Sequence, residues 1–81
     1  DRYVDHESMA QELDNVLNKV LKDREITIIR ECFGIGGPEK GLEEIGDRLG
    51  LTRERVRQIR EKSIAKLRDS GNAKILMKYL G

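Results

Sequence analysis

Four side chains between residues 53 and 58 carry complementary hydrogen-bonding chemistry. They are Arg53, Glu54, Arg57 and Gln58. Arginine can donate two hydrogen bonds to guanine, glutamine can form a bidentate pair with adenine, and glutamate can accept from cytosine N4. At about 100° per residue on a helix, Glu54 and Gln58 lie opposite Val56, and Arg57 flanks them. These four residues are therefore candidates for contacting the edges of DNA bases.

Basic residues dominate the same segment. Residues 52–68 carry seven basic and two acidic side chains, a net charge of +5, although the whole chain has a net charge of only +1. Residues 1–40 carry −3 and residues 41–81 carry +4. A basic helix suits nucleic-acid phosphates, which position a protein without specifying sequence. The candidates for phosphate contact on this helix are Arg55, Lys62, Lys66 and Arg68.

A solvated helix surface is the simpler explanation for any single charge in this segment. Glu54 or Glu61 can pair with Arg57 or Lys62 about one turn away. Arg60 lies near the expected buried side, where an arginine packs its stem or pairs with another helix more often than it contacts a base. For the set as a whole, DNA contact is favoured because a suitable helical scaffold surrounds it.

Residues 42–68 meet the requirements of a helix-turn-helix motif. Two helices that cross over a tight turn need apolar contacts, a very small residue where their backbones approach, and a glycine at the turn. Gly46 can occupy the crossing, Gly50 can form the turn, and Thr52 can cap the second helix. The apolar positions hold Ile45, Leu49, Leu51, Val56 and Ile59. A basic second helix on such a motif predicts DNA binding.

Other chemistries have weaker support. The only histidine, His6, and the only cysteine, Cys32, are far apart in the sequence and cannot form a zinc site. Both stand in structural contexts, so we expect no catalytic residue, no metal ion and no cofactor. The glycine-rich segment 34–41 is a loop, but neither a Gly-Lys-Ser/Thr sequence nor a preceding strand accompanies it. This favours a connector over a phosphate-binding P-loop.

The composition fits one small domain. The 81 residues are 37% hydrophobic and 38% charged, which allows one thin core. We expect no membrane association, because no apolar run approaches the ~20 residues of a membrane-spanning helix and no signal peptide is visible. A single cysteine fits a reducing cytoplasm. The sequence does not begin with methionine, so we expect it to be a fragment of a longer chain.

Helical periodicity extends through the chain without β-type alternation. The predicted helices cover residues 9–20 within a leading segment 1–20, then residues 24–33, 42–49, 53–68 and 73–80. Ser8 with Gln11 can form a capping box, Asp23 can cap the second helix, and Gly34 can end it. Cys32 is expected in the core, whereas Phe33 fits either the core or an exposed partner-binding patch. We expect an all-α fold, a small bundle of four to five helices.

The segment TRERVRQI at residues 52–59 closely resembles region 4 of the primary, sigma-70 type sigma factors of bacterial RNA polymerase. The likeness includes LEEIG at residues 42–46, RECFGI at residues 30–35, Arg24 and Glu25, Lys62, and KLR at residues 66–68. It spans residues 21–81, and the first twenty residues match only in helical character. The resemblance implies a winged-helix-like region 4 domain that comprises all 81 residues.

The resemblance implies promoter recognition in transcription initiation, through the major groove of the upstream, minus-thirty-five element. In the family, bases are contacted by the residues that match Arg53, Glu54 and Gln58, and DNA close by is contacted by the match of Arg57. Backbone phosphates lie near the matches of Arg24, Leu42 and Glu43. Four positions depart from the usual pattern: Gly41 replaces a capping Thr, Cys32 replaces a basic residue, Arg60 replaces a Glu, and Lys22 replaces a Ser or Thr. The loop at residues 36–41 is also about one residue short.

Protein partners and a compartment are also implied by the resemblance. The family's domain docks on the flap of the polymerase β subunit through an apolar surface of its first helices. Anti-sigma proteins use a surface that includes the match of Phe33. Activators bound upstream touch sigma at the matches of Lys62 and Arg68. A bacterial, cytoplasmic and nucleoid-associated protein is therefore expected.

Two alternatives remain beside a sigma factor. A free-standing helix-turn-helix regulator would dimerise to recognise a palindrome. Its interface would need the final helix, whose apolar residues are Ile75, Leu76, Tyr79 and Leu80. The other alternative is a helix-turn-helix used purely as a protein-interaction module.

Overall fold

The computed structural model describes residues 2–80, and within them it leaves out the side chains of residues 2–10, 73, 76, 79 and 80. Five helices follow one another: α1 (Arg2–Val20), α2 (Asp23–Phe33), α3 (Leu42–Leu49), α4 (Arg53–Asp69) and α5 (Ala73–Leu80). Residues 2–80 contain no β strand, so the expected all-α fold is confirmed and no β wing accompanies the helix-turn-helix.

Two predicted helix starts are wrong. The first helix begins at Arg2 and not at residue 9, so Ser8 lies inside α1 and cannot cap it; its side chain is outside the described residues. Asp23 is the first residue of α2, and Lys22 occupies the cap position. There the backbone N–H of Lys22 donates to Glu25 Oε1 at 2.9 Å. This is the same hydrogen bond that the glutamate of a capping box makes when the cap residue is serine or threonine. The predicted end at Gly34 is confirmed by its left-handed φ of 68°.

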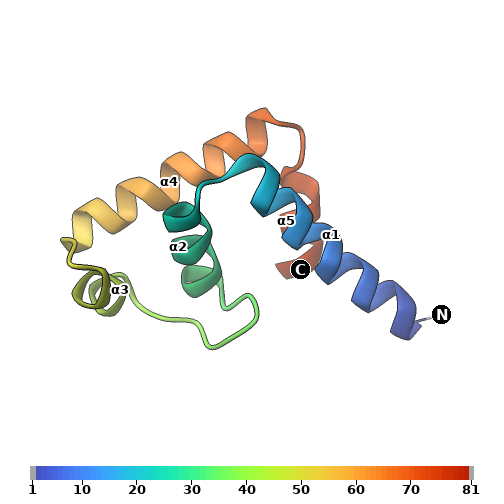
Figure 1. Cartoon of the computed structure of the whole chain (residues 1–81), viewed down its shortest axis with the longest axis horizontal. Helices are drawn as coiled ribbons and strands as arrows, with labels where there is room; N and C mark the ends of the chain where they lie inside the picture. The colour runs from blue at the N-terminus through green and yellow to red at the C-terminus, as the bar shows by residue number, and fades with distance from the viewer. Residues whose placement is uncertain (1, 81) are drawn as a thin grey trace.

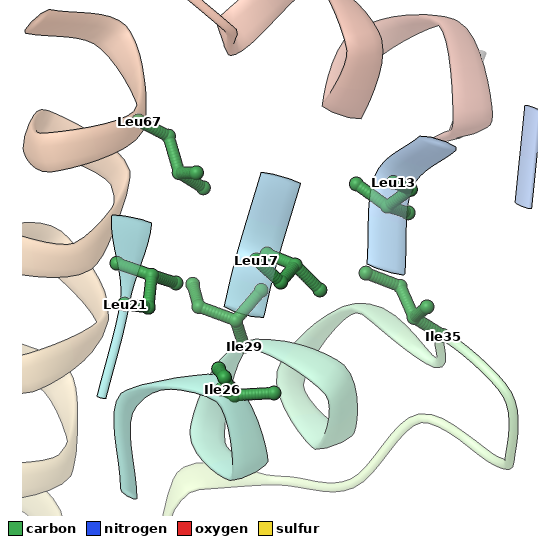
Figure 2. Packing of buried hydrophobic residues seen from close by; sticks show 7 residues of the cluster. All are labelled: Leu13, Leu17, Leu21, Ile26, Ile29, Ile35 and Leu67. Carbon is green, nitrogen blue, oxygen red and sulfur yellow. The ribbon is translucent and has the colours of Figure 1, made fainter. Parts of the chain in front are cut away.

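A first hydrophobic cluster joins α1, α2 and the far end of α4 (Figure 2). Leu17 and Ile29 are fully buried at its centre. Ile35, from the glycine-rich loop, packs on the same cluster, so the loop closes one side of the core. Ile75 of α5 is half-buried against it, whereas the side chains of Leu76, Tyr79 and Leu80 lie outside the described residues. The buried members are Leu13, Leu17, Leu21, Ile26, Ile29, Ile35 and Leu67.

A second hydrophobic cluster holds the helix-turn-helix against the other side of α2. Its buried members are Ile28, Cys32, Ile45, Val56 and Ile59. The prediction that Cys32 is a core residue is confirmed, and burial raises the pKa of its thiol. In Figure 1, α3 and the start of α4 lie at one end of the molecule, while α1 and α5 lie together at the other end. The second cluster therefore supports the end of the molecule that carries the candidate residues.

Candidate nucleic-acid interface

The turn between α3 and α4 depends on two glycines. A Cβ on Gly46 would lie 2.5 Å from the carbonyl oxygen of Leu51, so no larger residue fits where the two helices approach. The backbone N–H of Leu51 donates to Gly46 O at 2.8 Å across the same contact. Gly50 has a φ of 73°, a conformation that residues with a Cβ rarely adopt. The predicted roles of both glycines are confirmed.

The beginning of α4 is fixed by a cap and by two apolar contacts. Thr52 Oγ1 accepts a hydrogen bond from the backbone N–H of Arg55 at 3.1 Å, as predicted. Val56 and Ile59 are buried under α3 and α2. Because these side chains point inward, helical periodicity turns residues 54, 57 and 58 toward solvent. The rotation of α4 about its own axis is thereby set by the second cluster.

The four candidate base-contacting residues all lie exposed on the first two turns of α4. Arg57 donates to Glu54 through Nε at 3.0 Å and through Nη2 at 2.6 Å. This hydrogen bonding lowers the pKa of the Glu54 carboxyl and raises the pKa of Arg57. The simpler explanation, a pair between Glu54 and Arg57, is thus realised in the protein without DNA. Gln58 and Arg53 lie close enough to Glu54 to lower its pKa further.

The phosphate candidates on α4 fall into two groups. Arg55, Lys62 and Arg68 are exposed, and Arg68 Nε lies 3.4 Å from Asp69 Oδ1. Lys66 is half-buried, and its Nζ donates to Glu25 Oε2 at 2.7 Å. Lys66 therefore ties α4 to the first turn of α2. Its role toward DNA stays a prediction, and this contact gives it a structural role as well.

The candidates outside α4 lie at two helix starts. Arg24 is exposed in the first turn of α2. Leu42 and Glu43 are the first two residues of α3. The cap residue of α3, Gly41, has no side chain to accept from the backbone N–H groups of this turn. These donors are consequently open to another acceptor.

The structure shows the surroundings of two residues for which the sequence left alternatives open, Arg60 and Phe33. Arg60 is half-buried, but its ion pair, at 3.0 Å, joins it to Glu61 on the same helix and not to another helix. Phe33 is half-buried and packs against both hydrophobic clusters. It is thus a core residue with an accessible edge.

Ion pairs between distant segments were missed by the sequence analysis. Besides Glu25 with Lys66, Arg30 of α2 pairs with Asp14 of α1. Glu31 of α2 accepts from Arg48 at the end of α3, and its backbone carbonyl accepts from the N–H of Lys40, just before α3, at 2.8 Å. Glu31 therefore holds α3 near both of its ends. Ion-pair partners that are 16 or more residues apart leave no periodic signal in a sequence of which 38% is charged.

The described part of the chain has little else that suggests chemistry. No group of three metal-ligating side chains occurs within it. A pocket of about 300 Å³ opens between α2 and the glycine-rich loop, lined mainly by Thr27, Arg30, Ile35 and Lys40. None of the helices described is both long and apolar enough to cross a membrane.

Comparison with known proteins agrees with the helix-turn-helix geometry. The family model described as "Sigma-70, region 4" matches residues 19–69. The RNA polymerase sigma factor RpoD of Helicobacter pylori is 43% identical over 82 residues, an alignment that covers 95% of this chain and 12% of RpoD. The RNA polymerase sigma factor SigA of Listeria monocytogenes is 41% identical over 76 residues, with coverage of 93% and 20%.

The chain thus spans only a small part of the length of these relatives. The family match covers more than half of the chain and includes α2, α3 and α4. The chain belongs to the sigma-70 region 4 family.

Proposed function

We propose that this chain is the single promoter-recognition domain, residues 1–81, of a longer primary sigma factor, and that it binds the minus-thirty-five element in transcription initiation. One observation carries the proposal. Arg53, Glu54, Arg57 and Gln58 are exposed together on the first turns of the second helix of a helix-turn-helix. Such a helix inserts its N-terminal turns into the major groove, where every base pair presents a distinct pattern of donors and acceptors.

Phosphate contacts would orient this helix in the groove. Arg55, Lys62 and Arg68 flank the four base-contacting residues on α4. The open backbone N–H groups at Leu42 and Glu43 and the exposed Arg24 would bind the sugar–phosphate backbone on either side. Lys66 would contribute long-range positive charge to this surface while it remains bound to Glu25.

The proposed partners are promoter DNA and the RNA polymerase core, through the flap of its β subunit. Anti-sigma proteins would bind at the accessible edge of Phe33, and upstream activators near Lys62 and Arg68. The site would act in the bacterial cytoplasm at the nucleoid, without catalysis and without a cofactor. Few phosphate contacts give little counterion release, so the domain alone should bind weakly and core polymerase should supply the missing affinity by tethering it beside the promoter.

The test is Gln58→Ala in the full-length sigma factor assembled with core polymerase. Loss of one bidentate base contact should cost ~1–3 kcal/mol at one base pair of the upstream element and relax selectivity there. Lys62→Ala is the matched control, because it should weaken binding to all sequences about equally. It should also reduce the slope of log binding constant against log salt concentration by about one. Unchanged selectivity in Gln58→Ala, measured by competition between promoter fragments, would remove the basis of the proposal.

The alternatives make different predictions. A dimeric regulator would sediment as a stable dimer without polymerase. A pure interaction module would keep its function after the charges of Arg53 and Arg57 are reversed, whereas salt-sensitive DNA binding would be lost in the proposed function.

A further inference from the structure

The contact between Glu54 and Arg57 uses one particular edge of the guanidinium group. Nε and Nη2 donate to the two different carboxylate oxygens, at 3.0 and 2.6 Å. A guanidinium carries five N–H donors in one rigid plane. This side-on pair occupies two of them. One Nη1 donor and the second Nη2 donor form a parallel outer edge that Glu54 does not use, and the remaining Nη1 donor points back toward Cδ.

That outer edge has the geometry of a base-contacting group. Two parallel N–H donors match guanine O6 and N7, which is the commonest specific contact in the major groove. The side chain of Arg57 is 46% exposed while it is bound to Glu54, so the pair leaves room for a base. Glu54 is 61% exposed, and its carboxylate oxygens have lone pairs left for a neighbouring cytosine N4.

The pair also restrains a flexible side chain before DNA arrives. Arginine has many rotamers, and binding must select one of them at a cost in entropy. Two hydrogen bonds from a residue one turn away, on a helix whose rotation is set by Val56 and Ile59, limit the guanidinium to one plane. Glu54 itself is favoured in the first turn of α4 because the backbone N–H groups there attract negative charge.

We propose that Glu54 is a positioning residue for Arg57: its carboxylate holds the guanidinium so that the outer edge meets one guanine of the upstream element. The two side chains then recognise DNA as one coupled unit, not as two independent contacts. The inference rests on the proposed function, because it requires the start of α4 to lie in the major groove.

The test uses promoter fragments in which each guanine of the upstream element, on either strand, is replaced in turn by 7-deazaguanine, which lacks the N7 acceptor. Binding is measured with the full-length sigma factor and core polymerase. With the unmodified protein, replacement at one guanine should weaken binding by about tenfold. Arg57→Leu should remove this penalty, because leucine has no hydrogen-bond donor for guanine N7. Glu54→Gln should reduce the penalty to about threefold or less, because a neutral amide offers only one acceptor oxygen and no longer fixes the plane of the guanidinium.

The control is Glu61→Gln, which removes the same charge on the same helix. Glu61 influences Arg57 through its charge and gives it no hydrogen bond. This variant should keep the full tenfold penalty, so orientation is separated from charge. An unchanged penalty in Glu54→Gln would overturn the proposal, as would a penalty that survives Arg57→Leu, since a residue other than Arg57 would then contact the guanine.

Failure of the proposed function would look different. In that case the unmodified protein would not distinguish promoters with the upstream element from promoters without it, and no guanine position would matter. A positioning role is refuted only where the unmodified protein shows the guanine penalty and either Glu54→Gln or Arg57→Leu leaves it unaltered.

Discussion

The two hydrophobic clusters of this domain fix the positions of their helices in different ways. The first cluster, between α1, α2 and the end of α4, is built from leucine and isoleucine side chains and is flanked by ion pairs such as Arg30 with Asp14. The second cluster, under the helix-turn-helix, adds single-residue backbone constraints at Gly46, Gly50 and Thr52. Leucine packing tolerates small rearrangements, whereas a backbone contact through a glycine does not. The end of the molecule that would contact bases is therefore the end with the tighter constraint.

The largest expected effect on base selectivity comes from Gly46→Ala. The added methyl group would press on the backbone oxygen of Leu51, which cannot move without shifting α4. We expect a loss of about 1–3 kcal/mol in the free energy of unfolding. Discrimination of the upstream element by polymerase should fall more than this loss of folded protein explains. Urea denaturation and promoter competition measure the two quantities.

Leu17→Ala is the matched comparison in the first cluster. It should cost about 2–5 kcal/mol in stability, because Leu17 is fully buried. Among molecules that stay folded, base selectivity should be retained. Equal losses of selectivity for Gly46→Ala and Leu17→Ala would contradict the difference between the clusters.

An intermediate effect on stability is expected at low pH, through the ion pair between Glu25 of α2 and Lys66 of α4. Burial alone would raise the pKa of Glu25, but hydrogen bonds from the Lys22 backbone and from Lys66, with the charge of Lys66, outweigh it and lower the pKa. A carboxyl whose pKa is lower in the folded state stabilises the fold above its unfolded pKa, which is about 4.3 for glutamate, and this contribution disappears as the pH falls through the folded pKa.

The contribution should be about 0.5–1 kcal/mol, because solvent screens a pair in which the Lys66 side chain is 35% exposed. Unfolding free energies measured from pH 7 down to pH 3 should therefore fall less steeply in Glu25→Gln than in the unaltered protein. Parallel curves would mean that the contact does not depend on the charge of Glu25.

The smallest effect is expected at the start of α3, from Gly41→Ser. A Cβ at Gly41 meets no atom within 4 Å, and the residue already has the extended φ of −78° that a cap requires. A serine oxygen could accept from the free N–H groups of the first turn, so stability should rise by a few tenths of a kcal/mol. Thermal unfolding measures this rise, and Gly37→Ser, in equally open space outside any helix, should produce none.

The contrast between local backbone constraints and packing between distant residues also determines which features could be predicted from the sequence. The end of α3 and the start of α4 follow from Gly50 and Thr52, because Gly50 adopts the left-handed conformation and Thr52 caps α4. The exposure of the candidate base-contacting residues could be predicted because it follows from the inward direction of Val56 and Ile59. Which of them contacts which base stays a prediction.

What the sequence could not predict depends on contacts between distant residues. The contact between Lys66 and Glu25 depends on how α2 packs against α4. Nothing in the sequence near either residue indicates its partner. The cap at Lys22 was missed because the accepting group is the side chain of Glu25, three residues later, and not that of the cap residue. The early start of α1 at Arg2 was missed because Ser8 and Gln11, which have the spacing of a capping box, lie inside the helix.

Two adjacent residues of α2 connect the two halves of the molecule. Ile28 is fully buried in the second cluster, and Ile29 is fully buried in the first, so neighbouring positions of one helix lie in different cores. Neither cluster can come apart while α2 stays packed in both of them. The domain should therefore melt as one cooperative unit despite its two clusters, with the amide protons of the middle of α2 among the slowest to exchange with solvent. A partner that binds the α1 side could in this way change the thermal stability of the helix-turn-helix end without contacting it.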